Sequence, residues 1–308
     1  MPTEEPKIKE KMIQEHLGSS DSEARSPVWE ERWATLPVGR MRYLQAGTGR
    51  ALILIHGLMG YSFSWRFSIP ALASHATVYA VDNLGAGFSK SPDGLDCSMR
   101  ASAERILQFV DALDITDFDL LGTSHGGAVA MMTAALSAER GDDRLKRLVL
   151  VAPVNPWSRH GRLLAPFIGG RVGSFLFQNT VARWRFLDYL WLRRMFGDGS
   201  KIPPDSIAGY RRPVVENHGF RHGQNIVRTW LGDLADLELA ISKIRHYPTL
   251  LMWGTRDRAV SFRSAKRLEE CFSNCRLVAF KGVGHLPYEE AAEDFNRALL
   301  EFLEEKPI

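Results

Sequence analysis

Six short and largely apolar runs, separated by segments with helical spacing, constrain most strongly how this chain folds. The first run, Ala51-Leu52-Ile53-Leu54-Ile55, lies between Gly49 and Gly57 and contains no polar residue. A strand of this kind is buried on both faces, as in a parallel sheet. The five other runs that we predict to be strands cover residues 77–81, 118–121, 148–152, 249–253 and 277–280.

The segments between these runs are predicted to be helices. In one of them, Ile106, Phe109, Val110 and Leu113 recur at helical spacing. Because strands and helices alternate along the chain, we predict a mostly parallel sheet with helices on both of its faces. The predicted helices cover residues 62–74, 98–113, 128–139, 262–272 and 291–304.

The beginning of the chain and one long insertion depart from this alternation. Residues 33–36 and 41–45 alternate apolar with polar side chains and predict a hairpin, which raises the expected number of strands to eight. Residues 155–247 show no strand pattern, and their helix-like runs at 181–195 and 225–242 predict a helical cap. The cap is expected to cover the carboxyl edge of the sheet, where ligands bind in doubly wound folds. The predicted organisation is therefore a flexible N-terminal arm at 1–28, a core at 29–154 and 248–308, and a cap at 155–247.

The composition excludes several classes of protein. The formal net charge of +3 is too small to indicate nucleic-acid binding, and no apolar run approaches the ~20 residues of a membrane-spanning helix. The N-terminal residues lack the apolar centre of a signal peptide. The three cysteines, Cys97, Cys271 and Cys275, have no metal-binding pattern and are expected to be reduced thiols. These features predict a cytoplasmic protein.

The turn after the third run carries the first candidate catalytic residue. Gly122-x-Ser124-x-Gly126 stands between a predicted strand and a predicted helix, which is the pattern of a nucleophile elbow. Glycines on either side of the serine let strand and helix approach closely and leave the hydroxyl exposed. Without partners, however, the pattern is equally consistent with an ordinary glycine-rich turn.

A serine nucleophile needs a base that is oriented by a carboxylate. His285 follows the sixth run after a short loop, and Asp257 follows the fifth run. The alternatives are a solvated loop histidine and a turn aspartate. Because the carboxyl ends of parallel strands share one edge of the sheet, we predict a triad of Ser124, His285 and Asp257.

The oxyanion of an acyl-transfer reaction needs two backbone N–H donors. We expect His125 to supply one and Leu58, in the glycine-flanked turn after the first run, to supply the other, with Met59 as the alternative. The ring of His56 is expected to hold its own loop by a hydrogen bond. The ring of His125 is not expected to act in catalysis.

These motifs together resemble those of the α/β-hydrolase superfamily, over residues 30–304. The matching blocks are His56-Gly57, Asp82-x-x-Gly85-x-Gly87-x-Ser89, Gly122-Thr123-Ser124-His125-Gly126-Gly127, Trp253-Gly254-x-x-Asp257 and Gly284-His285-x-Pro287-x-x-Glu290. The resemblance implies an eight-stranded, mostly parallel sheet, a triad in the order Ser-Asp-His, no cofactor and no metal.

The resemblance also narrows the expected chemistry. Epoxide hydrolases and haloalkane dehalogenases of this superfamily have an aspartate at the position of Ser124, so we expect neither activity. Some members place the acid before the cap, where this chain has Asn155, so Asp257 remains the expected acid. We therefore expect a serine hydrolase that cleaves esters of a small or amphiphilic acyl substrate through an acyl-enzyme. The alternatives are carbon–carbon bond hydrolysis and a catalytically silent protein that binds a hydrophobic ligand.

Positive charge is concentrated on the cap. Residues 155–247 contain 12 Arg and 2 Lys against 5 Asp and 2 Glu, a net charge of +7, so the rest of the chain carries −4. Basic residues interleaved with aromatic ones suit a lipid surface, which suggests a weak membrane contact through the cap. The alternative is that the arginines lie on solvated helix faces and pair with carboxylates of the core.

Overall fold

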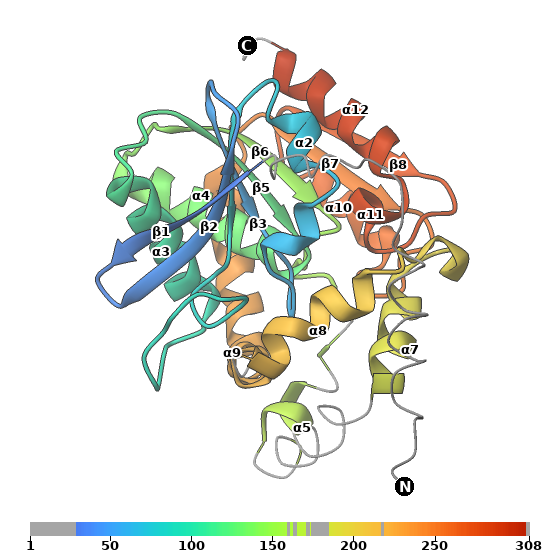
Figure 1. Ribbon diagram of the computed structural model, residues 1–308. Coiled ribbons are helices and arrows are strands. Elements are labelled where there is room, and N and C mark those ends of the chain that lie inside the picture. The colour runs from blue at the N-terminus through green and yellow to red at the C-terminus, as the bar shows by residue number, and fades with distance from the viewer. Residues whose placement is uncertain are drawn as a thin grey trace, which may run out of the picture.

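The computed structural model describes residues 29–158, 161–162, 165–170, 173, 185–216 and 219–305. The predicted flexible arm at 1–28 lies outside these residues. The described chain forms one eight-stranded sheet, with helices packed on both of its faces and a group of inserted helices at one edge (Figure 1).

The sheet has the strand order β1-β2-β4-β3-β5-β6-β7-β8. Strands β1 and β2 form the predicted hairpin, β2 pairs antiparallel with β4, and every other pairing is parallel. The mostly parallel sheet is therefore confirmed. Its strands are β1 (Glu30–Leu36), β2 (Gly39–Ala46), β3 (Ala51–Ile55), β4 (Thr77–Val81), β5 (Phe118–Thr123), β6 (Leu145–Val151), β7 (Thr249–Gly254) and β8 (Cys275–Phe280).

Strand β3 shows how one apolar run serves two hydrophobic cores. Successive side chains of a strand point to opposite faces of the sheet. Ile53 and Ile55 belong to the core on one face, and Leu52 and Leu54 to the core on the other. Helices α3 (Met99–Ala112), α4 (His125–Arg140) and α10 (Ala265–Glu269) cover the first face. Helices α2 (Ile69–Leu72) and α12 (Ala292–Glu304) cover the second.

Several core helices differ in extent from their predictions. The predicted helix at 62–74 is divided into η1 (Ser62–Trp65) and α2, because Pro70 has no N–H to donate and is accommodated best in the first turn of a helix. The predicted helix at 262–272 is likewise divided, into η4 (Phe262–Ser264) and α10, and the short helix α11 (Pro287–Glu290) precedes α12. Helix α4 begins at His125, three residues earlier than predicted.

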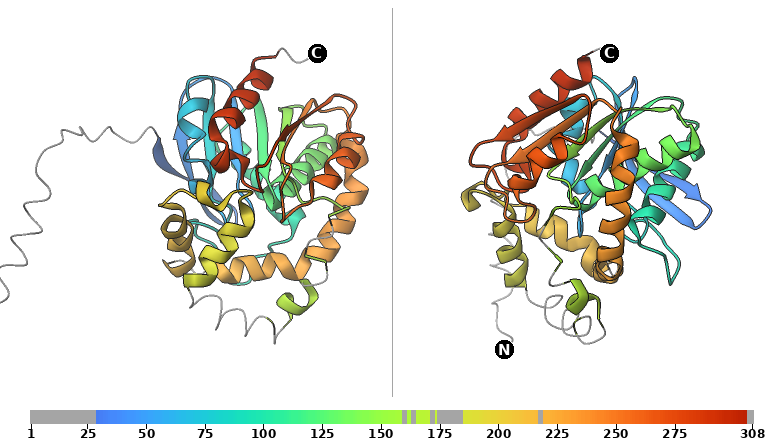
Figure 2. Two further views of the ribbon diagram at one scale, coloured as in Figure 1. Left: turned by 90° about the vertical axis from the view of Figure 1, so that its right-hand side faces the viewer. Right: turned by 180° about the vertical axis from the view of Figure 1, so that it is seen from behind.

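The described part of the insertion between β6 and β7 consists of helices joined by turns and irregular segments, and it contains no strand. Its helices lie over one edge of the sheet, at the end of the molecule opposite α12 (Figures 1 and 2). The predicted helix-like run at 225–242 corresponds to a helix that begins earlier, at Gly219. Of the predicted run at 181–195, residues 181–184 lie outside the described part of the chain. The domain bounds stay a prediction. The inserted elements are α5 (Ala165–Gly169), α7 (Arg185–Met195), η2 (Gly199–Lys201), α8 (Ser206–Glu216), α9 (Gly219–Ala240) and η3 (Ile241–Ile244).

Candidate active site

The turn between β5 and α4 holds Ser124 in a strained backbone conformation, with φ 54° and ψ −121°. Such a conformation costs a non-glycine residue on the order of 1–3 kcal/mol and needs support from its surroundings. The backbone provides it: the N–H of Ser124 donates to the carbonyl of Val151 at 2.9 Å, and its own carbonyl accepts from the N–H of Val154 at 2.9 Å. The nucleophile turn is therefore tied to the end of the neighbouring strand β6.

The flanking glycines are required by close backbone packing. A Cβ on Gly122 would lie 2.3 Å from the carbonyl oxygen of Gly126, and a Cβ on Gly126 would lie 2.2 Å from that of His56. Both distances are far shorter than van der Waals contact. Gly57 in turn lies against the nucleophile, where an added Cβ would be 3.1 Å from the Cβ of Ser124.

Two residues from strand ends form an acid–base pair beside this turn. Nδ1 of His285, which follows β8, lies 2.7 Å from Oδ2 of Asp257, which follows β7. The other carboxylate oxygen, Oδ1, accepts the N–H groups of Ala259 and Val260 at 2.7 and 2.8 Å. Because these two donors hold Oδ1, Oδ2 faces the imidazole. The Nδ1–H donates to the carboxylate, and Nε2 is left as the basic nitrogen.

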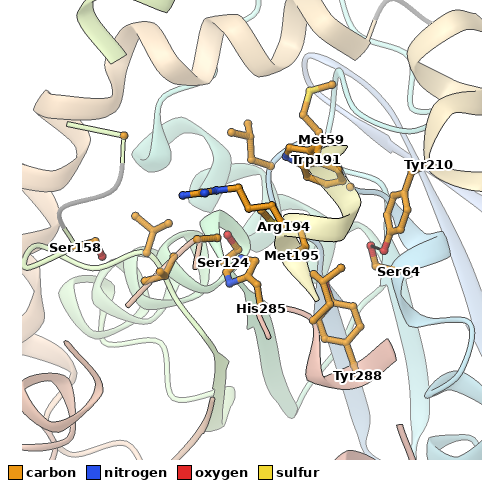
Figure 3. A pocket seen from close by; sticks show the side chains of 18 of the residues that line it. Met59, Ser64, Ser124, Ser158, Trp191, Arg194, Met195, Tyr210, His285 and Tyr288 are labelled. Atoms are coloured by element: carbon orange, nitrogen blue, oxygen red, sulfur yellow. Dashed lines mark hydrogen bonds between the residues drawn. The ribbon is translucent and has the colours of Figure 1, made fainter. Parts of the chain in front are cut away.

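Ser124 and His285 line the same cavity, which has a volume of about 430 Å³. Figure 3 shows the two side chains close together, with Trp191 and Arg194 of α7 nearby and Tyr210 on another side of the cavity. Three of the predicted site residues thus meet at the carboxyl edge of the sheet, beneath the inserted helices. The lining is largely apolar and aromatic, with the hydroxyl groups of Ser64, Ser158, Tyr210 and Tyr288.

Of the two predicted donors for an oxyanion, Leu58 lines this cavity, whereas His125 is not among the described residues that line it. Leu58 and Met59 line it directly, and Met59 has a positive φ of 62°. The N–H of Gly60 donates to the carbonyl of Gly57 at 3.0 Å, which closes the turn. His125 is the first residue of α4, and the N–H groups of a first turn have no acceptor within their own helix.

The structure separates the roles of the two histidine rings near Ser124. The Nε2 of His56 accepts the N–H of Asn83 at 3.1 Å, so its Nδ1–H donates to the carbonyl of Gly57 at 2.8 Å. This ring holds its own loop, as predicted. The ring of His125 is buried, stacks on Trp230 and has no partner for Nε2 among the described residues. Burial lowers the pKa of His125 to about 4, so this ring is neutral near pH 7.

A buried polar cluster joins the inserted helices to the core, and the sequence analysis missed it. Glu289 accepts from Arg66 at 2.9 Å, from Ser206 at 3.3 Å and from the hydroxyl of Tyr210. Burial and the nearby carboxylate of Glu289 raise the pKa of Tyr210, which keeps the phenol protonated as a donor. Single charged residues at unrelated positions carry no local pattern, so no motif could have revealed this cluster.

The base-bearing loop is also attached to the end of α7. The N–H of His285 donates to the carbonyl of Met195 at 2.6 Å. Glu290 accepts the N–H groups of Gly197, Asp198 and Gly284 at 2.7–2.9 Å. Glu290 belongs to one of the blocks noted in the sequence, and its place in the structure shows that it connects α7 to the loop of His285.

A family model for the alpha/beta hydrolase fold matches residues 50–292. The chain belongs to the α/β-hydrolase family. Among curated relatives of this α/β-hydrolase, haloalkane dehalogenase 2 of Mycobacterium tuberculosis is 31% identical over 285 residues, which cover 89% of this chain and 94% of the relative. The 2-hydroxy-6-oxo-2,4-heptadienoate hydrolase of Pseudomonas putida is 26% identical, over 83% of this chain and 90% of the relative.

Solved structures support the same fold. The epoxide hydrolase CorEH superposes with a TM-score of 0.77 at 24% identity, over 89% of this chain and 98% of that protein. The relatives of this α/β-hydrolase therefore act on different bonds, although they share one fold. Family membership identifies the chain as a hydrolase, whereas its substrate has to be inferred from the residues of the site.

Within the described part of this α/β-hydrolase, no group of three or more His, Cys, Asp or Glu side chains is arranged to hold a metal ion. None of the described helices is both long and apolar enough to span a bilayer. Asn155, at the alternative position of the acid, is buried and donates hydrogen bonds to the carbonyl of Pro153 and to Ser264.

Proposed function

We propose that this α/β-hydrolase cleaves carboxylic esters through an acyl-enzyme on Ser124. The observation that carries the proposal is the shared cavity of Ser124 and His285, with His285 held by Asp257 at 2.7 Å. Oδ1 of Asp257 is held by backbone donors, so the orientation of the imidazole is set before substrate binds.

Ester cleavage follows from this arrangement in two steps. Nε2 of His285 takes the proton of Ser124 as Oγ attacks the carbonyl carbon, and Asp257 stabilises the imidazolium that forms. The N–H groups of Leu58 and His125 stabilise the oxyanion. His285 then protonates the departing alcohol, and later activates a water molecule that releases the acid and restores Ser124.

The choice of nucleophile argues against two activities named among the relatives. A serine hydroxyl is the nucleophile of acyl transfer, whereas dehalogenases and epoxide hydrolases of this superfamily are expected to use an aspartate. Ser124 stands at that position, so we propose neither activity for this chain. The largely apolar lining of the cavity favours a small or amphiphilic acyl group.

Replacing Ser124 by alanine tests the proposal. The Ser124→Ala variant is expected to lose turnover of p-nitrophenyl esters and labelling by a fluorophosphonate probe, because the attacking oxygen is gone. Ser158→Ala is the matched control, since Ser158 lines the same cavity away from the elbow, and it should still be labelled. Labelling that persists in Ser124→Ala would remove Ser124 from the role of nucleophile.

Carbon–carbon bond hydrolysis is the second candidate function. It is favoured by the Pseudomonas putida relative, whose name describes a dienoate hydrolase, and by Arg194, a cation in the cavity wall that suits a carboxylate on the substrate. A vinylogous diketone acid and a p-nitrophenyl ester should be compared directly. A kcat/KM that is higher for the diketone would replace the ester proposal. Absence of both turnover and labelling would instead favour a silent ligand-binding protein.

We also propose a cytoplasmic location. Cys97, Cys271 and Cys275 are all free thiols in the structure, and free thiols are typical of a reducing compartment. Fractionation of cells that express the full chain tests this location directly.

A further inference from the structure

Helix α7 exposes apolar side chains where a surface helix normally carries polar ones. Phe186, Tyr189 and Leu190 are 61%, 41% and 43% exposed. Residues three and four apart lie side by side on a helix, so these three form one continuous patch, which we call the α7 face. The opposite side of the same helix is anchored, because Leu192 and Met195 are buried in the core. Within the described part of the chain, the α7 face is therefore an exposed apolar surface on a helix whose other side is packed against the core.

Positive charge accompanies this patch. Arg193 is exposed and follows Leu190 by three residues, so it extends the α7 face by one turn. In the sequence, the insertion as a whole carries a net charge of +7 and the rest of the chain −4. Another apolar side chain, Phe167 of α5, is 56% exposed. In Figures 1 and 2, α5 and α7 both lie at the end of the molecule opposite α12.

The same helix forms part of the cavity wall. Trp191, Arg194 and Met195 line the cavity that contains Ser124, and Trp191 is 41% exposed (Figure 3). The carbonyl of Met195 accepts the N–H of His285 at 2.6 Å. Helix α7 therefore contacts three different surroundings. The α7 face contacts solvent, Trp191 and Arg194 contact the cavity, and the carbonyl of Met195 binds the loop that carries His285.

We propose that the α7 face docks on an anionic lipid surface, from which the enzyme takes an amphiphilic ester. Helices with exposed aromatic residues and adjacent arginines bind at the boundary between headgroups and acyl chains. Anionic headgroups attract the positively charged insertion. A second copy of this chain is the less suitable occupant, because a symmetric dimer through the α7 face would place two positive insertions against each other. The substrate part of the inference rests on the proposed ester hydrolysis, whereas the docking part does not.

Vesicle binding by the full chain tests the docking part without catalysis. We expect co-sedimentation with vesicles of phosphatidylcholine and phosphatidylglycerol to exceed that with phosphatidylcholine alone by about tenfold, and to weaken as salt screens the charges. The double variant Phe186→Ser with Leu190→Ser should bind about tenfold less, because the inserted apolar area is lost. Leu239→Ser is the matched control, since Leu239 is 76% exposed on α9 and lies outside the α7 face; its binding should be unchanged.

Activity then tests the substrate part. The double variant should hydrolyse a short water-soluble ester as the unchanged protein does, because neither side chain lines the cavity, and should lose activity on an ester embedded in anionic vesicles. Equal binding of the double variant and the unchanged protein to anionic vesicles would overturn the docking. So would a concentration-dependent dimer that the double variant abolishes, which would assign the α7 face to a second copy. Vesicle binding without ester turnover would uphold the docking and reject the proposed ester hydrolysis.

Discussion

The phenol of Tyr210, on the inserted helix α8, donates a hydrogen bond to the buried carboxylate of Glu289, four residues after His285. Tyr210 also contacts Ser64 at 3.2 Å, and its ring packs edge-on against Phe63. One side chain of the insertion thus reaches both the cavity wall and the segment that carries the base. Buried hydrogen bonds therefore attach the insertion to the core.

Removal of the Tyr210 hydroxyl should weaken the attachment of the insertion to the core. We expect Tyr210→Phe to lower the free energy of unfolding by about 1–3 kcal/mol, because Glu289 loses a donor while it stays buried. Urea unfolding measures the change. Tyr189→Phe removes a hydroxyl from a residue that is 41% exposed and should change stability by less than about 0.5 kcal/mol. Equal losses in both variants would contradict a special role for the Tyr210–Glu289 contact.

Substitution of Asp257 by asparagine should damage catalysis far more than folding. The N–H groups of Ala259 and Val260 require an oxygen acceptor, so the amide oxygen of the substituted side chain would face them and its NH2 group would face His285. An NH2 group there favours the wrong tautomer of the imidazole, and kcat should fall by about 10⁴-fold. Steady-state kinetics with a p-nitrophenyl ester and a thermal melt separate the two effects. A kcat within tenfold of the unchanged protein would exclude Asp257 as the orienting acid.

Two glycine substitutions should have opposite effects on stability. A Cβ at Gly126 would lie 2.2 Å from the carbonyl oxygen of His56, so Gly126→Ala must displace backbone and should cost more than about 3 kcal/mol or prevent folding. Gly232 lies within α9 and has open space around its Cβ position. Gly232→Ala should therefore stabilise the protein by about 0.5–1 kcal/mol. Denaturant titration of both variants tests the pair, and a stable Gly126→Ala protein would contradict the close packing of the elbow.

Acid should destabilise the fold through its buried histidines. Burial lowers the pKa of His222 to about 3 and that of His125 to about 4. The unfolded chain, with an ordinary pKa near 6.5, binds protons that the folded chain excludes, so stability falls as the pH drops below about 6.5 and continues to fall toward these folded values. Each such imidazole removes up to about 1.4 kcal/mol per pH unit in that window.

The contribution of His222 can be isolated by substitution. In His222→Gln, unfolding free energies measured between pH 7 and pH 4 should decline less steeply than in the unchanged protein. Identical slopes in the variant and the unchanged protein would show that His222 is not excluded from protonation in the fold.

Local sequence patterns were sufficient for the elements of the core. The uninterrupted apolar run at 51–55 predicts β3 to the residue, because a strand buried on both faces has no polar side chain inside it. The run at 77–81 also gives the bounds of β4, although Thr77 and Tyr79 are only partly buried there. The predicted helix at 62–74 was wrong in extent because Pro70 restarts the helix there. Hydrophobic periodicity describes side chains only, so it does not show that Pro70 lacks the backbone N–H that the interior of a helix requires.

The sequence by itself determined the fold and the candidate residues at the carboxyl edge of the sheet, which are a serine between two glycines, and an aspartate and a histidine after later strands. Only the tertiary structure decided that His285 faces Asp257 and that Glu289 accepts a hydrogen bond from Tyr210. It also decided that the carbonyl of Met195 accepts the N–H of His285. The physical reason is distance along the chain. Helices and strands arise from neighbouring residues and leave a periodic trace, whereas contacts between residues tens of positions apart depend on packing and leave none.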